Sequence, residues 1–229
     1  MTAEANGVPV QLRNGRTALH LHCHKRADGP NLLLLHELYG NAHDWAEAAA
    51  GWDGSVFALD FSGHGRSGWR DGGIYSPEVL AADADAALGE LGDTFVAGAG
   101  VGAYAALLLA GGRPGSVRAA LLLPGEGLAG GGAEPQVHPD REAFARLIEA
   151  HRSSADPSSA SHDPRVVLSG SDMRPPDYAR VFAERAKALL LAEDGTPRPS
   201  WWEHLRDVDG VVRCTGDLGS ALGRLGNLV

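Results

Sequence analysis

The sequence predicts a single α/β domain with a mostly parallel sheet, antiparallel first strands and helices on both faces. Short apolar runs alternate with longer stretches of helical periodicity, which is typical of a parallel sheet flanked by helices. Asn14-Gly15 separates the first two strand-like runs, and Asn-Gly between alternating apolar residues favours a hairpin. The 229 residues are enough for one such domain with a sizeable core.

The apolar runs give the expected elements in order. Residues 31–36 and 55–60 are almost continuously apolar, which is typical of strands buried on both faces. The expected strands are residues 8–13, 17–25, 31–36, 55–60, 94–98, 118–123, 187–192 and 211–215. Apolar residues recur at helical spacing in residues 77–91, and small residues fill a second expected helix at 101–110. The tryptophan pair Trp201-Trp202 indicates a final helix, which packs on the sheet or forms a pocket or partner contact.

Between these elements, residues 125–185 are expected to form a small helical cap inserted into one domain of residues 1–229. The glycine-rich residues 125–133 indicate a loop, and residues 153–161 are rich in Ser, Ala and Pro. Residues 140–151 and 176–187 have the spacing of helices.

Composition excludes several classes of partner. Lys and Arg total 20 against 29 Asp and Glu, and this net charge of -9 repels phosphate backbones, so no nucleic acid is expected. No apolar run is long enough to span a bilayer, and the first residues lack a signal-peptide pattern. We therefore expect a cytoplasmic protein without a membrane partner, and the Ala, Gly and Arg bias indicates a bacterial source. Cys23 and Cys214 lie in apolar runs and are expected to be buried thiols, with a disulfide or a reactive thiol as the alternative.

Three segments occur in a fixed order: residues 33–45 (LLLHELYGNAHDW), 58–67 (ALDFSGHGRS) and 95–104 (FVAGAGVGAY). Together they resemble the α/β-hydrolase superfamily, in particular its branch of small-molecule esterases, C–C hydrolases and epoxide hydrolases. The resemblance extends over residues 8–123 and resumes weakly at residue 187. It implies the α/β-hydrolase fold, and the predicted cap matches no family pattern.

The third segment corresponds to the nucleophile turn of that superfamily, whose pattern is Gly-x-Ser-x-Gly. Here the turn reads Gly98-Ala99-Gly100-Val101-Gly102, so both flanking glycines are present and Gly100 stands at the serine position. The resemblance also implies that the backbone N–H groups of Leu38 and Val101 form an oxyanion hole. Leu38, Tyr39, Gly100 and Val101 are therefore the expected ligand-binding residues.

The other triad positions also depart from the pattern. The resemblance places the acid at Asp194 or Glu126, but its histidine is expected after the last strand, where Asp217 or Leu218 stands. No histidine follows His204 in this sequence. Without a serine and a histidine, Ser–His acyl transfer has no route.

Glu37 stands where the superfamily usually has glycine. A carboxylate beside an oxyanion hole opposes anion binding, unless Glu37 points to solvent or pairs with an arginine. Glu37, Glu126 and Asp194 are the candidate catalytic residues, because all three can lie at the carboxyl edge of the sheet, where ligands of α/β proteins bind. His36, Asp60, His64 and Arg66 are interpreted as loop scaffold.

His20, His22 and His24 alternate along one strand and share a face. Three imidazoles on one face can bind a metal ion, but a polar, solvated face is the favoured interpretation, and neither a metal nor a cofactor is expected.

Three functions are consistent with these features. The leading hypothesis is a superfamily member that binds a small, mostly apolar molecule, or converts it without hydrolysis through carboxylates and backbone donors. The second is a hydrolase of esters or related bonds with an unconventional nucleophile or base. The third is a non-catalytic scaffold or interaction subunit. A homodimer is consistent with any of them.

Overall fold

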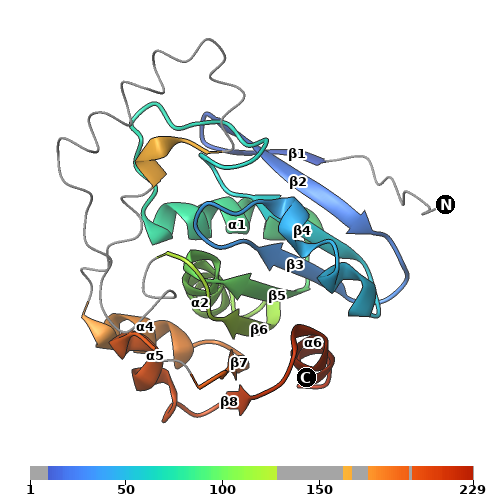
Figure 1. Ribbon diagram of the computed structural model, residues 1–229, viewed down its shortest axis with the longest axis vertical. Helices are drawn as coiled ribbons and strands as arrows, with labels where there is room; N and C mark the ends of the chain where they lie inside the picture. Colours follow the sequence, from blue (N-terminus) through green and yellow to red (C-terminus); the bar gives the residue numbers. More distant parts are fainter. Residues whose placement is uncertain (1–9, 128–161, 167–174, 196–197, 229) are drawn as a thin grey trace.

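The computed structural model describes residues 10–127, 162–166, 175–195 and 198–228, which form one eight-stranded sheet and its covering helices (Figure 1). The strands are β1 (Val10–Asn14), β2 (Thr17–Lys25), β3 (Asn31–Leu35), β4 (Val56–Asp60), β5 (Thr94–Ala99), β6 (Val117–Leu123), β7 (Leu189–Ala192) and β8 (Val211–Cys214). The helices are α1 (Pro77–Leu91), α2 (Val101–Gly112), α4 (Pro176–Ala183), α5 (Ser200–Leu205) and α6 (Leu218–Gly226), with 3-10 helices η1 (Ala42–Trp45) and η2 (Ala48–Gly51).

The sheet is mostly parallel, as predicted. Its strand order is β1-β2-β4-β3-β5-β6-β7-β8, and β1 and β8 form its two edges (Figure 1). β2 pairs antiparallel with β1 and β4, and every later pairing is parallel. The expected mostly parallel sheet with antiparallel first strands is therefore confirmed.

Helices cover both faces of the sheet, as predicted. Leu33 and Leu35 of β3 point into a core built with α1, α2, α4 and α5, whereas Leu32 and Leu34 point into a second core with α6 and η1. All four leucines are fully buried, which explains why β3 reads as a continuous apolar run. Helix α2 is buried from Val101 to Gly111, and its rigid packing fixes the turn that precedes it.

The C-terminal elements differ from the prediction in one respect. The tryptophan pair lies in α5 and packs in the core, but α6 follows it and was missed. The sequence of α6, LGSALGRLG, contains three glycines, which lower helix propensity and hide the apolar face of Ala221, Leu222 and Leu225. Asp217 starts this helix, because its Oδ1 accepts a hydrogen bond of 2.8 Å from the Ser220 N–H.

Part of the predicted cap range is described. Residues 162–166 adjoin the loop after β4: His162 forms a β-bridge with His64, and Asp163 accepts a hydrogen bond from the Tyr75 hydroxyl at 2.7 Å. Helix α4 packs against α2 and α5. The expected helix at 140–151 and the loop at 153–161 lie outside the described residues, so the cap boundaries stay a prediction.

The histidines of β2 share one face, as predicted, but that face is partly covered. His20 is buried, His22 and His24 are partly buried, and the His43 ring of η1 lies 4.9 Å from the His22 ring. His24 Nε2 lies 2.8 Å from the Ala42 carbonyl oxygen. The expected solvated face is therefore only partly solvated, because His43 and the Ala42 carbonyl of η1 contact it. Within the described ranges, no group of three or more His, Cys, Asp or Glu residues is arranged to hold a metal ion.

Two further expectations concern the cysteines and the bilayer. Cys23 and Cys214 are buried free thiols, as expected, and burial raises the pKa of each. In the part of the chain that the structure describes, no helix has the length and apolar character needed to cross a membrane.

Asp83 of α1 connects three parts of the fold and is fully buried. Its carboxylate accepts hydrogen bonds from the Asn14 side chain at 2.7 Å and from the Ser62 N–H at 2.9 Å, and it pairs with Arg70 at 2.8 Å.

We expect Asp83→Ala to lower the free energy of unfolding by roughly 2–4 kcal/mol, because it leaves these buried donors without a partner. Denaturant unfolding measures this change. The control is Asp85→Ala, on the same helix as Asp83, which removes an exposed ion pair with Arg113. An equal loss of stability in both variants would contradict the prediction.

The histidine cluster predicts acid sensitivity. Burial, followed by the neighbouring rings of His24 and His43, lowers the pKa of His22 from 6.5 to about 4. Between these pH values the unfolded chain binds a proton that the folded protein does not, so stability falls as the pH falls through this window. We expect His22→Gln to flatten the fall of Tm across the window, whereas the exposed His204→Gln should keep the wild-type profile. Parallel curves for wild type and His22→Gln would show that the cluster does not contribute.

Candidate functional site

The nucleophile turn keeps the geometry that the glycine pattern predicted. Gly100 lies between β5 and α2 with φ 55° and ψ -122°, a conformation that residues with side chains rarely adopt. A Cβ on Gly98 would overlap the Gly102 backbone, so the flanking glycines allow β5 and α2 to approach closely. The sharp strand-to-helix turn is therefore present, without a side chain at its apex.

A backbone carbonyl of the chain itself occupies the space above this turn. The N–H groups of Leu38 and Val101 both donate to the carbonyl oxygen of Glu126, each at 3.1 Å. The two expected oxyanion-hole donors thus converge on one spot, as predicted, and an internal oxygen fills it. A Cβ on Gly100 would overlap that same oxygen, so a serine side chain at residue 100 is incompatible with this arrangement.

Glu37 stabilises the segment that fills the hole. Its Oε2 accepts a hydrogen bond of 2.7 Å from the backbone N–H of Glu126. The expectation that Glu37 points to solvent or pairs with an arginine was wrong, because the turn after β6 brings a backbone donor to the partly buried carboxylate. Glu37 therefore binds the neighbouring N–H rather than opposing the group in the hole.

The other two candidate carboxylates have different surroundings. The Glu126 side chain is exposed, and it is the backbone of this residue that enters the site. Asp194 follows β7, as expected, but its half-exposed carboxylate pairs with the buried guanidinium of Arg198 at 2.5 Å. The structure thus brings Glu37 and Glu126 into direct contact and ties Asp194 to Arg198.

The position of the expected histidine has a structural role. Asp217 caps α6, and this backbone hydrogen bond from Ser220 lowers the pKa of its carboxyl group. Leu218, the next residue, points into a cavity beside the nucleophile turn. Leu218 has no group that titrates, and the capping hydrogen bond makes the Asp217 carboxylate a weaker base than an imidazole.

This cavity has a volume of about 200 Å³, below the usual range of about 300–1,000 Å³ for sites of drug-sized ligands. Its lining comes from η1, the loop after β3, the end of β5 and the start of α6: His36, Glu37, Asp44, Trp45, Ala99 and Leu218. Trp45 Nε1 is buried without a hydrogen-bond partner among the described residues. Sequence reasoning missed Asp44 and Trp45, although both lie in the first quoted motif.

His36 is scaffold, as interpreted. Its Nδ1 donates to the Glu37 carbonyl oxygen at 2.7 Å, and its Nε2 accepts from the Phe61 N–H at 3.1 Å. Burial lowers its pKa. Asp60 and Arg66 also hold loops together, because the Asp60 carboxylate accepts hydrogen bonds from the Ala42 and Arg66 N–H groups at 2.7 and 2.9 Å.

Tyr39 lies beside the site in a strained conformation. Its φ of 67° is the only positive value among described residues other than glycine. The ring is 41% exposed and lies 5.0 Å from the His162 ring, and burial together with the Glu126 charge raises the pKa of its hydroxyl. Tyr39 is therefore accessible near the segment that fills the hole.

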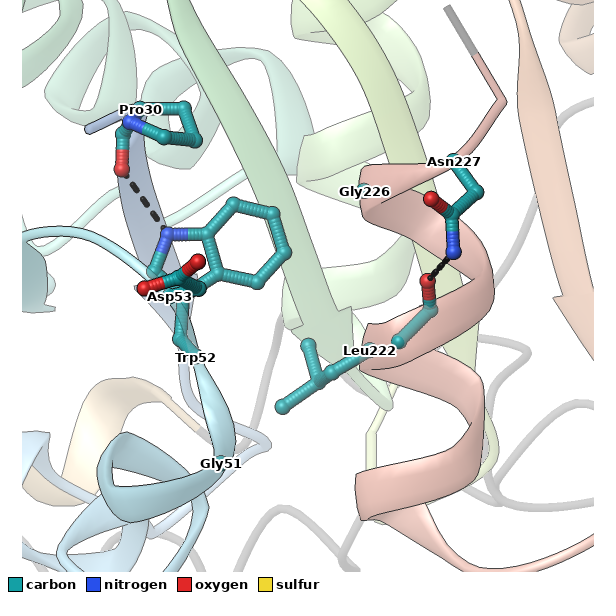
Figure 2. A pocket seen from close by; sticks show the side chains of 8 residues that line it. Pro30, Gly51, Trp52, Asp53, Leu222, Gly226 and Asn227 are labelled. Carbon is teal, nitrogen blue, oxygen red and sulfur yellow. Dashed lines mark hydrogen bonds between the residues drawn. The ribbon is translucent and has the colours of Figure 1, made fainter.

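A larger cavity, of about 340 Å³, lies elsewhere in the molecule. Figure 2 shows the Trp52 ring and α6 facing each other across it, with Trp52 Nε1 donating to the Pro30 carbonyl oxygen at 2.8 Å. Pro30 precedes β3, whereas Gly100 follows the carboxyl end of the parallel strand β5. This cavity therefore lies at the amino ends of the parallel strands, opposite the end where Gly100 lies. Ligands of open α/β sheets bind at the carboxyl edge, and we therefore assign the candidate site to the nucleophile turn.

Comparisons with known proteins agree with this fold. A stretch of 83 residues is 37% identical to the esterase Rv0045c of Mycobacterium tuberculosis, and it spans 35% of this chain and 28% of that esterase. An α/β hydrolase from Novosphingobium aromaticivorans matches over all of both chains with a TM-score of 0.66 and 19% identity. The bottromycin epimerase BotH, in complex with bottromycin A2, matches over 96% of each chain with a TM-score of 0.63 and 21% identity. At these identities the two structures show a shared fold.

The family assignment rests on a longer match. Residues 35–172, more than half of the chain, match the sequence profile of the family described as serine aminopeptidase, S33, and the match includes the turn at Gly100. The chain therefore belongs to the serine aminopeptidase S33 family of the α/β-hydrolase superfamily.

Proposed function

We propose that this chain is a ligand-binding member of the hydrolase family that does not perform Ser–His acyl transfer. It holds a small, mostly apolar molecule next to the nucleophile turn, or converts it without hydrolysis. The observation that carries the proposal is the position of the Glu126 carbonyl oxygen, which accepts both expected oxyanion-hole hydrogen bonds directly above Gly100.

Serine-hydrolase chemistry needs three groups that are lacking or already engaged here. The attack needs a nucleophile, and Gly100 has no side chain. Stabilisation of the tetrahedral intermediate needs free N–H donors, whereas those of Leu38 and Val101 already bind Glu126. Proton transfer needs a base, and the histidine position holds Asp217 and Leu218.

Support for small-molecule binding comes from the cavity beside the turn. Trp45, Ala99 and Leu218 provide apolar walls, while Glu37 provides a polar group. This combination is typical of a small-ligand site. The fold also accommodates reactions other than hydrolysis, since BotH is named an epimerase.

A hydrolase with an unconventional nucleophile or base is the second candidate. The 37% identity to an esterase over 83 residues and the family membership favour it. A filled site together with an exposed tryptophan patch would favour the scaffold hypothesis. The Glu126 carbonyl does fill the spot above Gly100, but four of the five tryptophans are buried: Trp45, Trp52, Trp201 and Trp202.

A fluorophosphonate probe tests the two candidates against each other. Because Gly100 has no nucleophilic atom, we expect no stoichiometric labelling and no acyl-enzyme burst with an activated ester such as p-nitrophenyl acetate. Intact-mass spectrometry and stopped-flow absorbance measure the two readouts, with an ordinary serine esterase as the positive control. Labelling of a serine next to the turn would overturn the proposal and favour the hydrolase.

Replacement of the turn glycine tests the geometry. We expect Gly100→Ser to remain inactive on esters and to lower the unfolding free energy by roughly 1–3 kcal/mol, because the new side chain has a strained φ and overlaps the Glu126 carbonyl. The control is Gly112→Ser, where no atom lies within 4 Å of an added Cβ and φ is not positive. A second change, Leu218→His, should restore at most a trace of activity. Strong hydrolysis by Gly100→Ser alone would show that a base is already present.

A further inference from the structure

The nucleophile turn binds the backbone of one residue through both of its polar groups. The carbonyl oxygen of Glu126 accepts from the Leu38 and Val101 N–H groups, and the N–H of the same residue donates to the Glu37 carboxylate. The Glu126 side chain is exposed. Three hydrogen bonds therefore recognise the main chain at this position.

The fit around this residue is close. A Cβ on Gly125 would overlap Glu37 Oε2 and lie 2.9 Å from the Gly100 nitrogen. On the other side, a Cβ on Gly127 would lie 2.7 Å from the Leu38 Cβ. The segment of residues 125–127 thus lies against the turn with only backbone at both neighbouring positions.

The donor and acceptor pattern discriminates between classes of ligand. An ester offers a carbonyl oxygen to Leu38 and Val101 but no N–H to Glu37, so it would leave a partly buried carboxylate without its partner. A hydrogen bond to a charged acceptor is stronger than one between neutral groups, so its loss disfavours a ligand without the N–H. A ligand that replaces Glu126 therefore needs an N–H group and a C=O group. The two groups must have the same spacing and orientation as the N–H and C=O of a single amino-acid residue.

We infer that the site at Gly100 takes a ligand with an N-acylated amino-acid amide unit, which displaces the backbone of Glu126. The inference rests on the proposed function, because it assigns a ligand class to the same site. Glu37 acts as the specificity-determining residue through its acceptor oxygen. The cavity of about 200 Å³, which Glu37 and Ala99 line, takes a small apolar substituent of that ligand.

The internal segment of residues 125–127 competes with any ligand for the site, and its effective concentration is high because it is part of the same chain. The apparent affinity of the wild-type protein for a ligand is therefore the affinity of the open site multiplied by the fraction of molecules in which the site is open. A substitution that weakens the binding of residues 125–127 to the turn should therefore make the difference in affinity between ligands measurable. Gly125→Ala does this, because its methyl group overlaps the Glu37 oxygen.

The experiment compares two probes on the full chain. Acetylglycine N-methylamide carries the required N–H and C=O, and acetylsarcosine N-methylamide has a methyl group in place of that N–H. Amide hydrogen exchange and ¹⁵N–¹H spectra report on Leu38, Val101 and Glu126, whose N–H groups form the three hydrogen bonds. The control for the glycine substitution is Gly112→Ala, where no atom lies within 4 Å of the added Cβ.

In Gly125→Ala we expect faster exchange of the Leu38 and Val101 amides than in wild type or Gly112→Ala. The acetylglycine probe should restore their protection and bind at least about tenfold tighter than the sarcosine probe. Glu37→Ala in the Gly125→Ala background should abolish this discrimination. In the wild-type protein, a high concentration of the acetylglycine probe should accelerate exchange of the Glu126 amide, so the test does not depend on the variant folding.

Equal binding of the two probes, discrimination that survives Glu37→Ala, or unchanged Leu38 and Val101 exchange with either probe would overturn the inference. Probe binding and amide exchange test this inference. The proposed function is tested separately, by serine labelling and ester turnover. A protein that binds the acetylglycine probe and is also labelled would retain the ligand class and lose the binding-only role.

Discussion

The arrangement at the candidate site depends on one interaction, the pair of hydrogen bonds from Leu38 and Val101 to the Glu126 carbonyl oxygen. These donors come from the loop after β3 and from the start of α2, and the acceptor follows β6, so the pair connects the carboxyl ends of three parallel strands. An oxyanion hole is built to hold a partial negative charge on oxygen. In this protein an uncharged peptide carbonyl occupies that position.

The fold fixes the position of a donor in this interaction. Helix α2 is buried along almost its whole length, so the position of the Val101 N–H is fixed by packing. Glu37 holds the other side of the segment through the Glu126 N–H. The same end of α2 and the same loop would orient a substrate in an active hydrolase, and here they orient part of the chain.

Much of the fold could be predicted from the sequence, because its signals are local. The Asn14-Gly15 hairpin, the apolar run of β3 and the glycines around Gly100 each determine a backbone geometry within a few residues. Helix α6 was missed because its glycines weaken the helical pattern, and its cap at Asp217 was considered only as a triad position. The partly covered histidine face was missed because its cover, η1, comes from a distant loop.

The content of the site could be predicted only in part. Gly100 and the positions of Leu38 and Val101 follow from the motifs, but a backbone carbonyl from residue 126 has no side-chain signature in a sequence. The partner of Glu37 is likewise a main-chain N–H, and any residue other than proline could supply it. The glycines at residues 125 and 127 were the available signal, since they permit the close approach of this segment.

The overlap between a residue-100 side chain and the Glu126 carbonyl couples two distant parts of the sequence. A chain with serine at this turn could not hold residues 125–127 where they lie here, so residue 100 and this segment can change only together. A histidine at residue 217 would likewise remove the side chain that caps α6. Substitutions at residues 100 and 217 are therefore tied to the surrounding backbone, and neither position can be exchanged without a change in its neighbours.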